Sequence, residues 1–329
     1  MIRLKKLLAG SVALLLLTGC GKSDIKDTTA ELNSANETVV SVPATVSIEQ
    51  TSEQTEAAEK PLALSENEFP RMNGSTATIP LGEAIASVIM GKDRPDCEQY
   101  VQFTGTSDAY VQLVDGNTDF LVVYEPSETT KEYIKKSGVD LESVSIGRDA
   151  LVFLVNTQNP VNGLTTRQIK DIYSGNITNW MNVGGTNSTI KPYQRNATAG
   201  SQALMVKLVM KDIPFMQGPE TYLTDSMEGL VTAISAYNNG EFAIGYNVYY
   251  YVTKMKDDEN VKMLAVDGVT PEYETIAGGQ YPFVNDFYVV IRKDAPKDSS
   301  QRKLFEWIQS AEGKALIDLE GYVIFDGHR

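Results

Sequence analysis

The sequence predicts an α/β fold with largely parallel sheets, because strand-like runs and helix-like segments alternate along most of its length. Runs of β-branched and aromatic residues predict strands at residues 120–124, 150–156, 242–246 and 287–292. The segments between them carry helix-start and helix-stop signals, and no internal repeat is visible. About 260 residues of such sequence are enough for one domain or two.

The helices expected between these strands have recognisable ends. Pro80 stands in the first turn of the first helix, where its missing N–H needs no partner. The apolar face of this helix comprises Leu81, Ala84, Ile85, Val88 and Ile89. Thr165 and Gln168 have the spacing of a capping box, and Gly175 is expected to stop the helix that they begin.

Two further helix ends lie later in the chain. A helix is expected to open at Gly200, and another is expected to end at Asn239 and Gly240. The apolar residues of the helix that opens at Gly200 are Leu204, Val206, Leu208 and Val209.

The chain begins with an expected export signal. A basic start precedes an apolar run at residues 7–17, which is shorter than the roughly 20 residues of a membrane-spanning helix. The Leu-Thr-Gly-Cys sequence at 17–20 resembles the lipobox of bacterial lipoproteins. We therefore expect residues 1–19 to be a signal peptide and Cys20 to be the lipidated N-terminus, carrying palmitate and anchored to the outer face of the cell membrane. The alternative is an ordinary signal in which Cys20 has no role.

Residues 20–68 are expected to be the lipidated N-terminus followed by a disordered tether. Residues 21–68 contain no aromatic side chain and have ten acidic residues against three basic ones. Such a stretch has too little apolar surface to offset the entropic cost of ordering it. We therefore expect folded sequence to begin near Phe69.

Composition narrows the possible functions. The formal net charge of −14 becomes −17 without residues 1–19, so the protein repels polyphosphate backbones and nucleic-acid binding is not expected. Beyond Cys20 the chain has one cysteine, Cys97, and its one histidine is His328. The chain therefore has too few histidine and cysteine residues for histidine-dependent catalysis or for a zinc site with nitrogen and sulfur ligands. We expect neither an enzyme nor a cofactor or metal.

Three loops run into expected helices and carry hydrogen-bond donors, at residues 74–80, 104–107 and 195–201. Each helix start presents unpaired N–H groups and the positive end of the helix dipole. Arg195 adds a planar guanidinium that matches tetrahedral oxyanions. If the three starts converge, they form an anion site. Taken singly, their hydroxyls are ordinary helix caps and Arg195 is a surface ion-pair partner.

An ordered set of motifs resembles the phosphate-binding proteins of ABC importers, the PstS type. In chain order they are Gly74-Ser75-Thr76-Ala77-Thr78, Gly105-Thr106-Ser107, Asn159-Pro160-Val161, Leu164-Thr165, Gln168-Ile169, Ile172-Tyr173-Ser174-Gly175, Ile177-Thr178-Asn179-Trp180, Val183-Gly184-Gly185, Gln194-Arg195-Asn196, Ala243-Ile244-Gly245-Tyr246, Glu312-Gly313 and Gly321-Tyr322. The resemblance extends from about residue 70 to the end of the chain.

That resemblance implies a two-lobed type II periplasmic-binding-protein fold with the ligand cleft between the lobes. We expect the chain to cross between lobes near Leu151–Asn156 and near Phe287–Arg292. Lobe one would then be residues 69–154 plus 288–329, and lobe two residues 155–287. The lobes would close around the ligand by a hinge motion, and a membrane permease would recognise the closed form.

The resemblance also implies a set of phosphate contacts. They come from Thr78, Ile79, Thr106, Arg195, Gly200 and Ser201. Thr78 and Thr106 would donate hydroxyl protons, Ile79 a backbone N–H, and Arg195 would clamp the anion. Gly200 and Ser201 would close on the anion from the second lobe. Further candidates are Ser75, Ser107, Glu125, Arg148, Thr198 and Ala199.

The chain departs from the family pattern in several places. Ala199 replaces a serine, although Thr198 beside it offers a hydroxyl, and Ala197 replaces the acidic residue that orients the arginine. Tyr124 stands where the family has an aspartate that accepts a hydrogen bond from protonated phosphate, and Glu125 is one position away. Phosphate selectivity therefore depends on whether Glu125 faces the cleft.

Arg148 has two possible positions, in the cleft or on the surface of a lobe.

The sequence thus predicts an extracytoplasmic, lipid-anchored solute-binding protein, expected to be a monomer. It would capture inorganic phosphate or a similar oxyanion and deliver it to an ABC permease in the membrane. The alternative is a surface sensor or interaction module on the same fold that binds another oxyanion or none. A phosphatase on this scaffold is disfavoured, because no pair of nucleophile and base is visible.

Overall fold

The computed structural model describes residues 61–218, 222–236 and 242–324. The expected signal peptide, Cys20, most of the expected tether, and the helix end at Asn239 and Gly240 lie outside these residues. The described residues belong to one compact unit, Glu59–Arg329. Within them, no helix is both long and apolar enough to cross a membrane.

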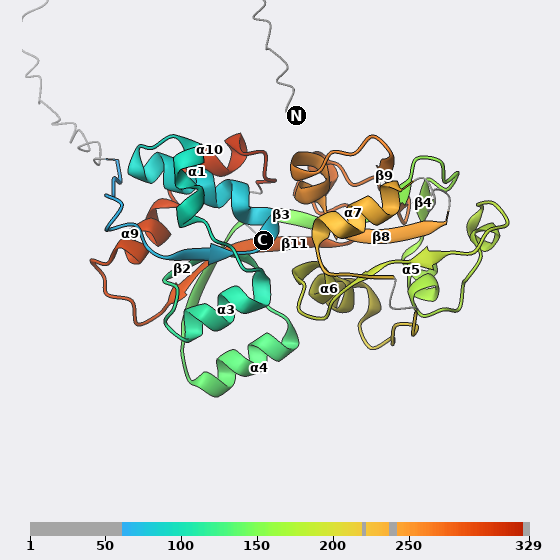
Figure 1. Cartoon of the computed structure of the whole chain (residues 1–329), viewed down its shortest axis with the longest axis horizontal. Helices are drawn as coiled ribbons and strands as arrows, with labels where there is room; N and C mark the ends of the chain where they lie inside the picture. Colours follow the sequence, from blue (N-terminus) through green and yellow to red (C-terminus); the bar gives the residue numbers. More distant parts are fainter. Residues whose placement is uncertain (1–60, 219–221, 237–241, 325–329) are drawn as a thin grey trace, which may run out of the picture. The chain divides into compact units, whose positions relative to one another are not determined.

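A mixed sheet runs through this unit, with strand order β1-β2-β11-β3-β8-β5 and β9 paired to β3 (Figure 1). Its strands are β1 (Met72–Gly74), β2 (Phe120–Tyr124), β3 (Leu141–Asn156), β5 (Lys191–Pro192), β8 (Ala243–Val248), β9 (Val261–Met263) and β11 (Val284–Arg292). Two smaller pairs are β4 (Gly163–Leu164) with β10 (Ala265–Val266), and β6 (Gln194–Arg195) with β7 (Leu223–Thr224). All four predicted strands are present, and the α/β class is confirmed.

The expectation of largely parallel sheets is wrong. In the main sheet β1 pairs with β2 and β5 with β8 in parallel, whereas every pairing of β3 and β11 is antiparallel. The chain passes from the first lobe to the second in β3 and returns into β11, so these neighbouring strands run in opposite directions. The two central strands therefore give the sheet its antiparallel character.

The long strand β3 joins the two lobes. Its residues 141–150 pair with β11, and its residues 151–155 pair with β8. Val284, at the start of β11, lies opposite Ala150. The change of pairing partner in β3 thus falls between residues 150 and 151, and the pairing of β11 begins at Val284, both within the crossing strands that the sequence predicted. The first part of β3 was missed because its residues are mostly half-buried and mix polar with apolar side chains.

Helices cover the sheet of the first lobe on both faces (Figure 1). They are α1 (Ile79–Met90), α2 (Arg94–Cys97), α3 (Thr106–Val114), α4 (Glu128–Ser137), α9 (Ser300–Trp307) and α10 (Ala311–Leu319), with 3-10 turns at Thr76–Thr78 and Glu98–Tyr100. The expected apolar face of α1 is buried except for Val88, which is 53% exposed. Ala86 is buried in its place, because the face turned to the core is centred slightly away from Val88.

The second lobe contains shorter helices. They are α5 (Thr166–Tyr173), α6 (Gly200–Leu204), α7 (Met227–Ser235) and α8 (Tyr273–Ala277), with a 3-10 turn at Trp180–Val183 and π-helical segments at Met205–Met210 and Tyr251–Met255. The predicted capping box of Thr165 and Gln168 is confirmed, and α5 ends two residues before Gly175. α6 begins at Gly200 as expected, but it continues as a π-helix, whose different winding leaves Val206 40% exposed.

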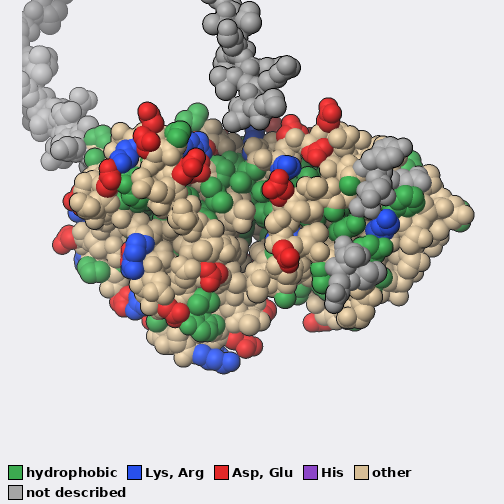
Figure 2. Space-filling view, viewed as in Figure 1, with side chains coloured by type: hydrophobic (Ala, Val, Ile, Leu, Met, Phe, Trp, Pro, Cys, Tyr) green, Lys and Arg blue, Asp and Glu red, His purple; other side chains and the backbone are tan. Residues whose placement is uncertain are grey.

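Folded structure begins before Phe69. Leu64 is 8% exposed and belongs to the hydrophobic core, and its N–H donates to the carbonyl of Ile89 at 3.0 Å. Residues 64–68, which the sequence assigned to the tether, are therefore part of the folded structure, because Leu64 anchors this polar stretch to α1. On the face shown in Figure 2, acidic side chains are scattered among basic ones rather than gathered in one patch.

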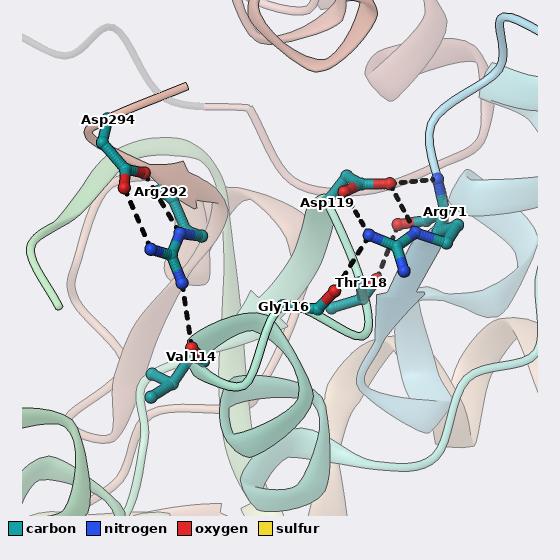
Figure 3. A network of polar contacts seen from close by, with 7 residues as sticks. All are labelled: Arg71, Val114, Gly116, Thr118, Asp119, Arg292 and Asp294. Carbon is teal, nitrogen blue, oxygen red and sulfur yellow. Dashed lines mark hydrogen bonds and ion pairs between the residues drawn. The ribbon is translucent and has the colours of Figure 1, made fainter. Parts of the chain in front are cut away.

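Two arginines hold the end of α3 (Figure 3). Arg71 donates to both carboxylate oxygens of Asp119, at 2.8 and 2.7 Å, and to the carbonyl of Gly116 at 3.0 Å. Arg292 donates to the carbonyl of Val114, the last residue of α3, at 2.9 Å. A cation at a helix C-terminus also complements the helix dipole. These bonds tie the C-terminal end of α3 to the start of β1 and to the end of β11.

Candidate functional site

A small cavity of about 190 Å³ lies between the lobes. Its walls come from both of them: Ser75, Thr76, Thr104, Gly105, Thr106 and Tyr124 from the first lobe, and Arg195, Asn196, Thr198, Ala199, Gly200, Asp225 and Met227 from the second. Sites for drug-sized ligands usually measure about 300–1,000 Å³. The cavity is therefore sized for a small ion, and we call it the anion cavity because its walls are rich in donors.

The two lobes touch at the edge of the anion cavity. The hydroxyl of Ser107 donates to the carbonyl of Thr198 across the cleft at 3.2 Å. A Cβ atom added to Gly200 would lie 2.5 Å from the Oγ1 of Thr106, which is closer than packed atoms approach. The absence of a side chain at Gly200 is thus what lets the second lobe reach the first.

Two hydroxyls on the wall of the first lobe share one hydrogen bond. The Ser75 Oγ and Thr106 Oγ1 atoms are 2.7 Å apart, and the N–H of Tyr124 donates to the Ser75 oxygen at 3.1 Å. The two hydroxyls carry two protons, and only one is needed for the bond between them. The second proton remains for a ligand in the cavity, whichever hydroxyl carries it.

Two helices present uncapped N-termini to the cavity. The N-cap residues are Gly105 for α3 and Ala199 for α6, and neither offers a side-chain oxygen to the first N–H groups. Gly105 has φ of 99°, a conformation that favours glycine. By contrast α5, elsewhere in the second lobe, is capped by the hydroxyl of Thr165, and α7, whose first residue Met227 also lines the cavity, is capped by the hydroxyl of Ser226. Uncapped N–H groups and positive dipole ends favour an anion between α3 and α6.

Arg195 is a buried cation without a carboxylate partner in the described residues. The residue is 8% exposed, and its Nε and Nη2 donate to the carbonyls of Thr224 and Asp225, both at 3.2 Å. Its Nη1 is buried and has no hydrogen-bond partner in this part of the chain. Burial lowers the pKa of Arg195 below its ordinary value, because the charged form has lost solvation. A buried charge of this kind is stabilised by an anion beside it.

Ser201 follows Gly200 in the first turn of α6. It is 1% exposed, and its Oγ has no hydrogen-bond partner among the described residues. An unpaired buried hydroxyl costs free energy until a partner arrives. Ser201 Oγ and the Nη1 of Arg195 are thus two buried donors without partners among the described residues; Arg195 lines the anion cavity, and Ser201 adjoins the lining residue Gly200.

Residues 49–314 match the PBP superfamily domain. The chain belongs to the PBP superfamily. The phosphate-binding protein PstS of Bacillus subtilis is 27% identical over 256 residues, which are 77% of this chain and 79% of that protein. PstS of Staphylococcus epidermidis is 26% identical over 263 residues, with 76% and 77% covered.

Solved structures show the same two-lobed fold. A phosphate ABC transporter substrate-binding protein from Clostridium perfringens, solved with bound phosphate, has a TM-score of 0.63 and 25% identity, covering 78% of this chain and 98% of that one. An ABC-type phosphate transport receptor from Vibrio cholerae has a TM-score of 0.58 at 23% identity, with 77% and 98% covered, and shares the fold. The predicted family and the type II fold are confirmed.

In this member of the PBP superfamily, about half of the predicted contact residues line the anion cavity. They are Ser75, Thr106, Arg195, Thr198, Ala199 and Gly200. Ser107 lies at its edge, through its hydrogen bond to the carbonyl of Thr198, and Ser201 follows the lining residue Gly200 without lining the cavity itself. Thr78, Ile79, Glu125 and Arg148 do not line it.

Thr78 has a different role from the predicted one. Its hydroxyl donates to the carbonyls of Val122 and Ser75, at 2.6 and 2.9 Å, and the residue is fully buried. The single hydroxyl proton is therefore used to hold the 75–78 turn against β2. Ile79 begins α1, and its backbone N–H, the predicted phosphate donor, donates to the carbonyl of Thr76.

Glu125 faces a second cavity, of about 770 Å³, lined by the start of α4 and by Arg195 and side chains that follow it in the second lobe. Its carboxylate accepts from Lys131 at 2.9 Å and pairs with Lys207 of the other lobe. Burial alone would raise the pKa of Glu125, but hydrogen bonds from Lys207 and Lys131 outweigh it and hold the pKa below 4.5. Glu125 therefore ties the lobes together and does not face the anion cavity.

Arg148 lies on the crossing strands. Its Nε donates to Asp286 on β11 at 3.0 Å, and its Nη1 donates to the carbonyl of Ala277 at 3.1 Å. The ion pair with Asp286 holds Arg148 between the paired strands β3 and β11. Arg148 therefore lies neither in the anion cavity nor on the outer surface of a lobe, the two positions that the sequence left open.

Tyr124 lines the cavity, but its hydroxyl is already engaged. It donates to a carboxylate oxygen of Asp149 at 2.6 Å. The other oxygen of Asp149 accepts the N–H of Ala150 at 2.7 Å and of Tyr250 at 3.1 Å. Burial raises the pKa of Asp149 to about 6. Asp149 therefore links both lobes at the crossing strand β3, behind the wall of the cavity.

No sequence signal indicated Asp225 or Met227 as cavity residues. Strands β6 and β7 pair in parallel, with Arg195 opposite Thr224, so Asn196 and Asp225 follow at the same edge. These strands have two residues each, which is too short for a periodic pattern.

Proposed function

We propose that this protein captures inorganic phosphate, or a closely similar oxyanion, and supplies it to an ABC importer. The observation that carries the proposal is the buried guanidinium of Arg195 beside a small cavity walled by donors. The similarity to proteins named as phosphate-binding supports phosphate as the ligand.

Binding would depend on local groups, because the protein as a whole is negative. A net charge of −14 repels an approaching anion at long range. Inside the cavity, the Nη1 of Arg195, the uncapped N–H groups of α3 and α6 and one hydroxyl proton of the Ser75–Thr106 pair all donate. Charge-assisted hydrogen bonds in a water-poor site are the strong kind.

Capture would be coupled to closure of the lobes. The contacts of Ser107 with Thr198 and of Glu125 with Lys207 join the lobes on either side of Tyr124. An anion that bonds to α3 on one lobe and α6 on the other favours the closed arrangement. The permease would recognise this closed form, in which both lobes present one continuous surface.

We also propose that the protein acts outside the cytoplasm as a monomer anchored through lipid on Cys20. The basic start, the apolar run and the Leu-Thr-Gly-Cys sequence support this. The test is incorporation of labelled palmitate, followed by fractionation of cells. Wild-type protein is expected in the membrane fraction and Cys20→Ala in the medium; equal release of both would contradict the anchor.

Calorimetric titration of the purified full-length protein with phosphate tests the main proposal. We expect heat of binding and a rise in Tm with phosphate concentration, because the ligand binds only the native state. No heat and no rise in Tm at millimolar phosphate would refute it. Binding of molybdate or tungstate without phosphate would favour the alternative, a sensor for another oxyanion.

A further inference from the structure

We infer that the protein also binds organic phosphoryl compounds, with the phosphoryl group in the anion cavity and an uncharged, apolar substituent in the second cavity. The class comprises phosphate monoesters and phosphonates, since both carry one phosphoryl group on one organic group. This inference rests on the proposed function, because the donors proposed for phosphate would also hold the phosphoryl oxygens.

The two cavities adjoin between the lobes. In the second lobe, Arg195 and Asn196 line both of them. In the first lobe, Tyr124 lines the anion cavity and the next residue, Glu125, lines the second cavity. The Nη1 of Arg195 is buried and has no partner among the described residues, so this donor for a phosphoryl oxygen belongs to a residue that both cavities share. A ligand bound beside Arg195 can therefore extend into the second cavity.

The second cavity has the size of a site for an organic molecule. Its volume of about 770 Å³ falls within the range of about 300–1,000 Å³ that is usual for such sites. The anion cavity, of about 190 Å³, is sized for a small ion. Inorganic phosphate therefore uses only the smaller space, whereas a phosphoryl group with an organic substituent uses both.

The wall of the second cavity suits an apolar group. The second lobe contributes apolar side chains to it, from Ala197, Ala203, Leu204, Val206, Phe215 and Leu223. Val206 and Leu223 are 40% and 54% exposed, so they are not part of the core. Exposed apolar side chains that gather around a hollow are typical of a binding site. A substituent in the second cavity would cover them.

The charges around the second cavity balance. Among the described residues that line it, the acidic ones are Glu125, Glu128 and Asp212, and the basic ones are Arg195, Lys207 and Lys211. Glu125 is paired with Lys131 and Lys207, and Lys131 also pairs with Glu128. The wall therefore offers no excess of either sign to a charged substituent, and an uncharged one avoids the cost of losing hydration.

An apolar substituent would strengthen binding through burial. The free energy gained is proportional to the apolar area removed from water. A phenyl group reaches much further into the second cavity than a methyl group on the same phosphoryl head. We therefore expect affinity to rise about tenfold or more from methyl to phenyl.

The experiment compares phenylphosphonate with methylphosphonate in calorimetric titrations of the full-length protein. The two probes share the phosphoryl group, so the ratio of the methylphosphonate Kd to the phenylphosphonate Kd reports on the substituent. We expect a ratio of about 10 or more in wild-type protein. Ala203→Phe places a ring in the second cavity and should lower the ratio to about 1.

Two other variants complete the test. Leu223→Ser removes apolar area at an exposed position of the second cavity, and it serves where Ala203→Phe does not fold. It should lower the ratio about threefold. Val88→Phe is the matched control, because it adds a ring at an exposed position of α1 that lines neither cavity. This control should leave the ratio at its wild-type value.

The results distinguish this inference from the proposed function. If wild-type protein binds phosphate but binds phenylphosphonate no more tightly than methylphosphonate, the inference is wrong and the proposed function stands. A ratio that stays high in both Ala203→Phe and Leu223→Ser would also overturn the inference, because the substituent would then lie outside the second cavity. If wild-type protein binds phenylphosphonate and not phosphate, the proposed function fails and the inference stands. If it binds none of the three anions, both fail.

Discussion

Replacing Arg195 with alanine separates binding from stability. In the structure the Nη1 group has two N–H donors and no partner in the described residues, and both are available to an anion. A hydrogen bond to a charged group contributes about 1.5–3 kcal/mol, so losing two should cost about 3 kcal/mol or more. We therefore expect Arg195→Ala to raise the Kd for phosphate by about 100-fold or more in calorimetric titration.

The stability of the ligand-free protein should change much less. The variant loses the bonds to the carbonyls of Thr224 and Asp225, but it also removes a buried, unpaired charge. Arg148→Ala is the control, since this arginine is partly buried and paired with Asp286. It should lower the free energy of unfolding and leave the Kd unchanged. A phosphate Kd within threefold of wild type in Arg195→Ala would refute the reasoning.

Three further predictions follow from other contacts. Gly200→Ala should weaken phosphate binding about tenfold at unchanged unfolding stability, since its Cβ would press on Thr106 and hold the lobes apart; normal binding by calorimetry would contradict this. Lys207→Met should weaken binding about threefold, and the loss should vanish at high salt, because the pair with Glu125 is partly exposed. Burial raises the pKa of Asp149 from 3.8 to about 6, so the folded state binds more protons in this range. The stability that it contributes is full below pH 3.8 and is lost as pH rises to about 6, by about 3 kcal/mol. The difference in unfolding free energy between wild type and Asp149→Asn, measured by urea titration, should fall by that amount; a constant difference would show that Asp149 does not titrate there.

Local signals were sufficient for most of the elements. The β2 strand at Phe120–Tyr124 and the capping box at Thr165 and Gln168 were predicted to the residue, because each depends on neighbours in sequence. The direction of strand pairing was not predictable in this way. It depends on where the chain crosses between lobes, and the partners of β3 lie far from it in sequence.

Predicted residues line the cavity where a sequence motif determines the path of the backbone. The sequence was uninformative where contacts between distant parts of the chain determine which residue or side chain reaches the cavity. Arg195 and Gly200 line the cavity because their loop leads into α6. The hydroxyl of Thr78 instead bonds to Val122, which is 44 residues away. Asp225 enters the cavity through the pairing of two very short strands, which no local pattern reveals.

A crystal structure of the protein with phosphate tests the central claim most directly. We predict one anion in the cavity between the lobes, about 2.7–3.2 Å from the Nη1 of Arg195 and from N–H groups at the starts of α3 and α6. An anion bound elsewhere, or a cavity that holds only water while Arg195 pairs with a carboxylate, would contradict it.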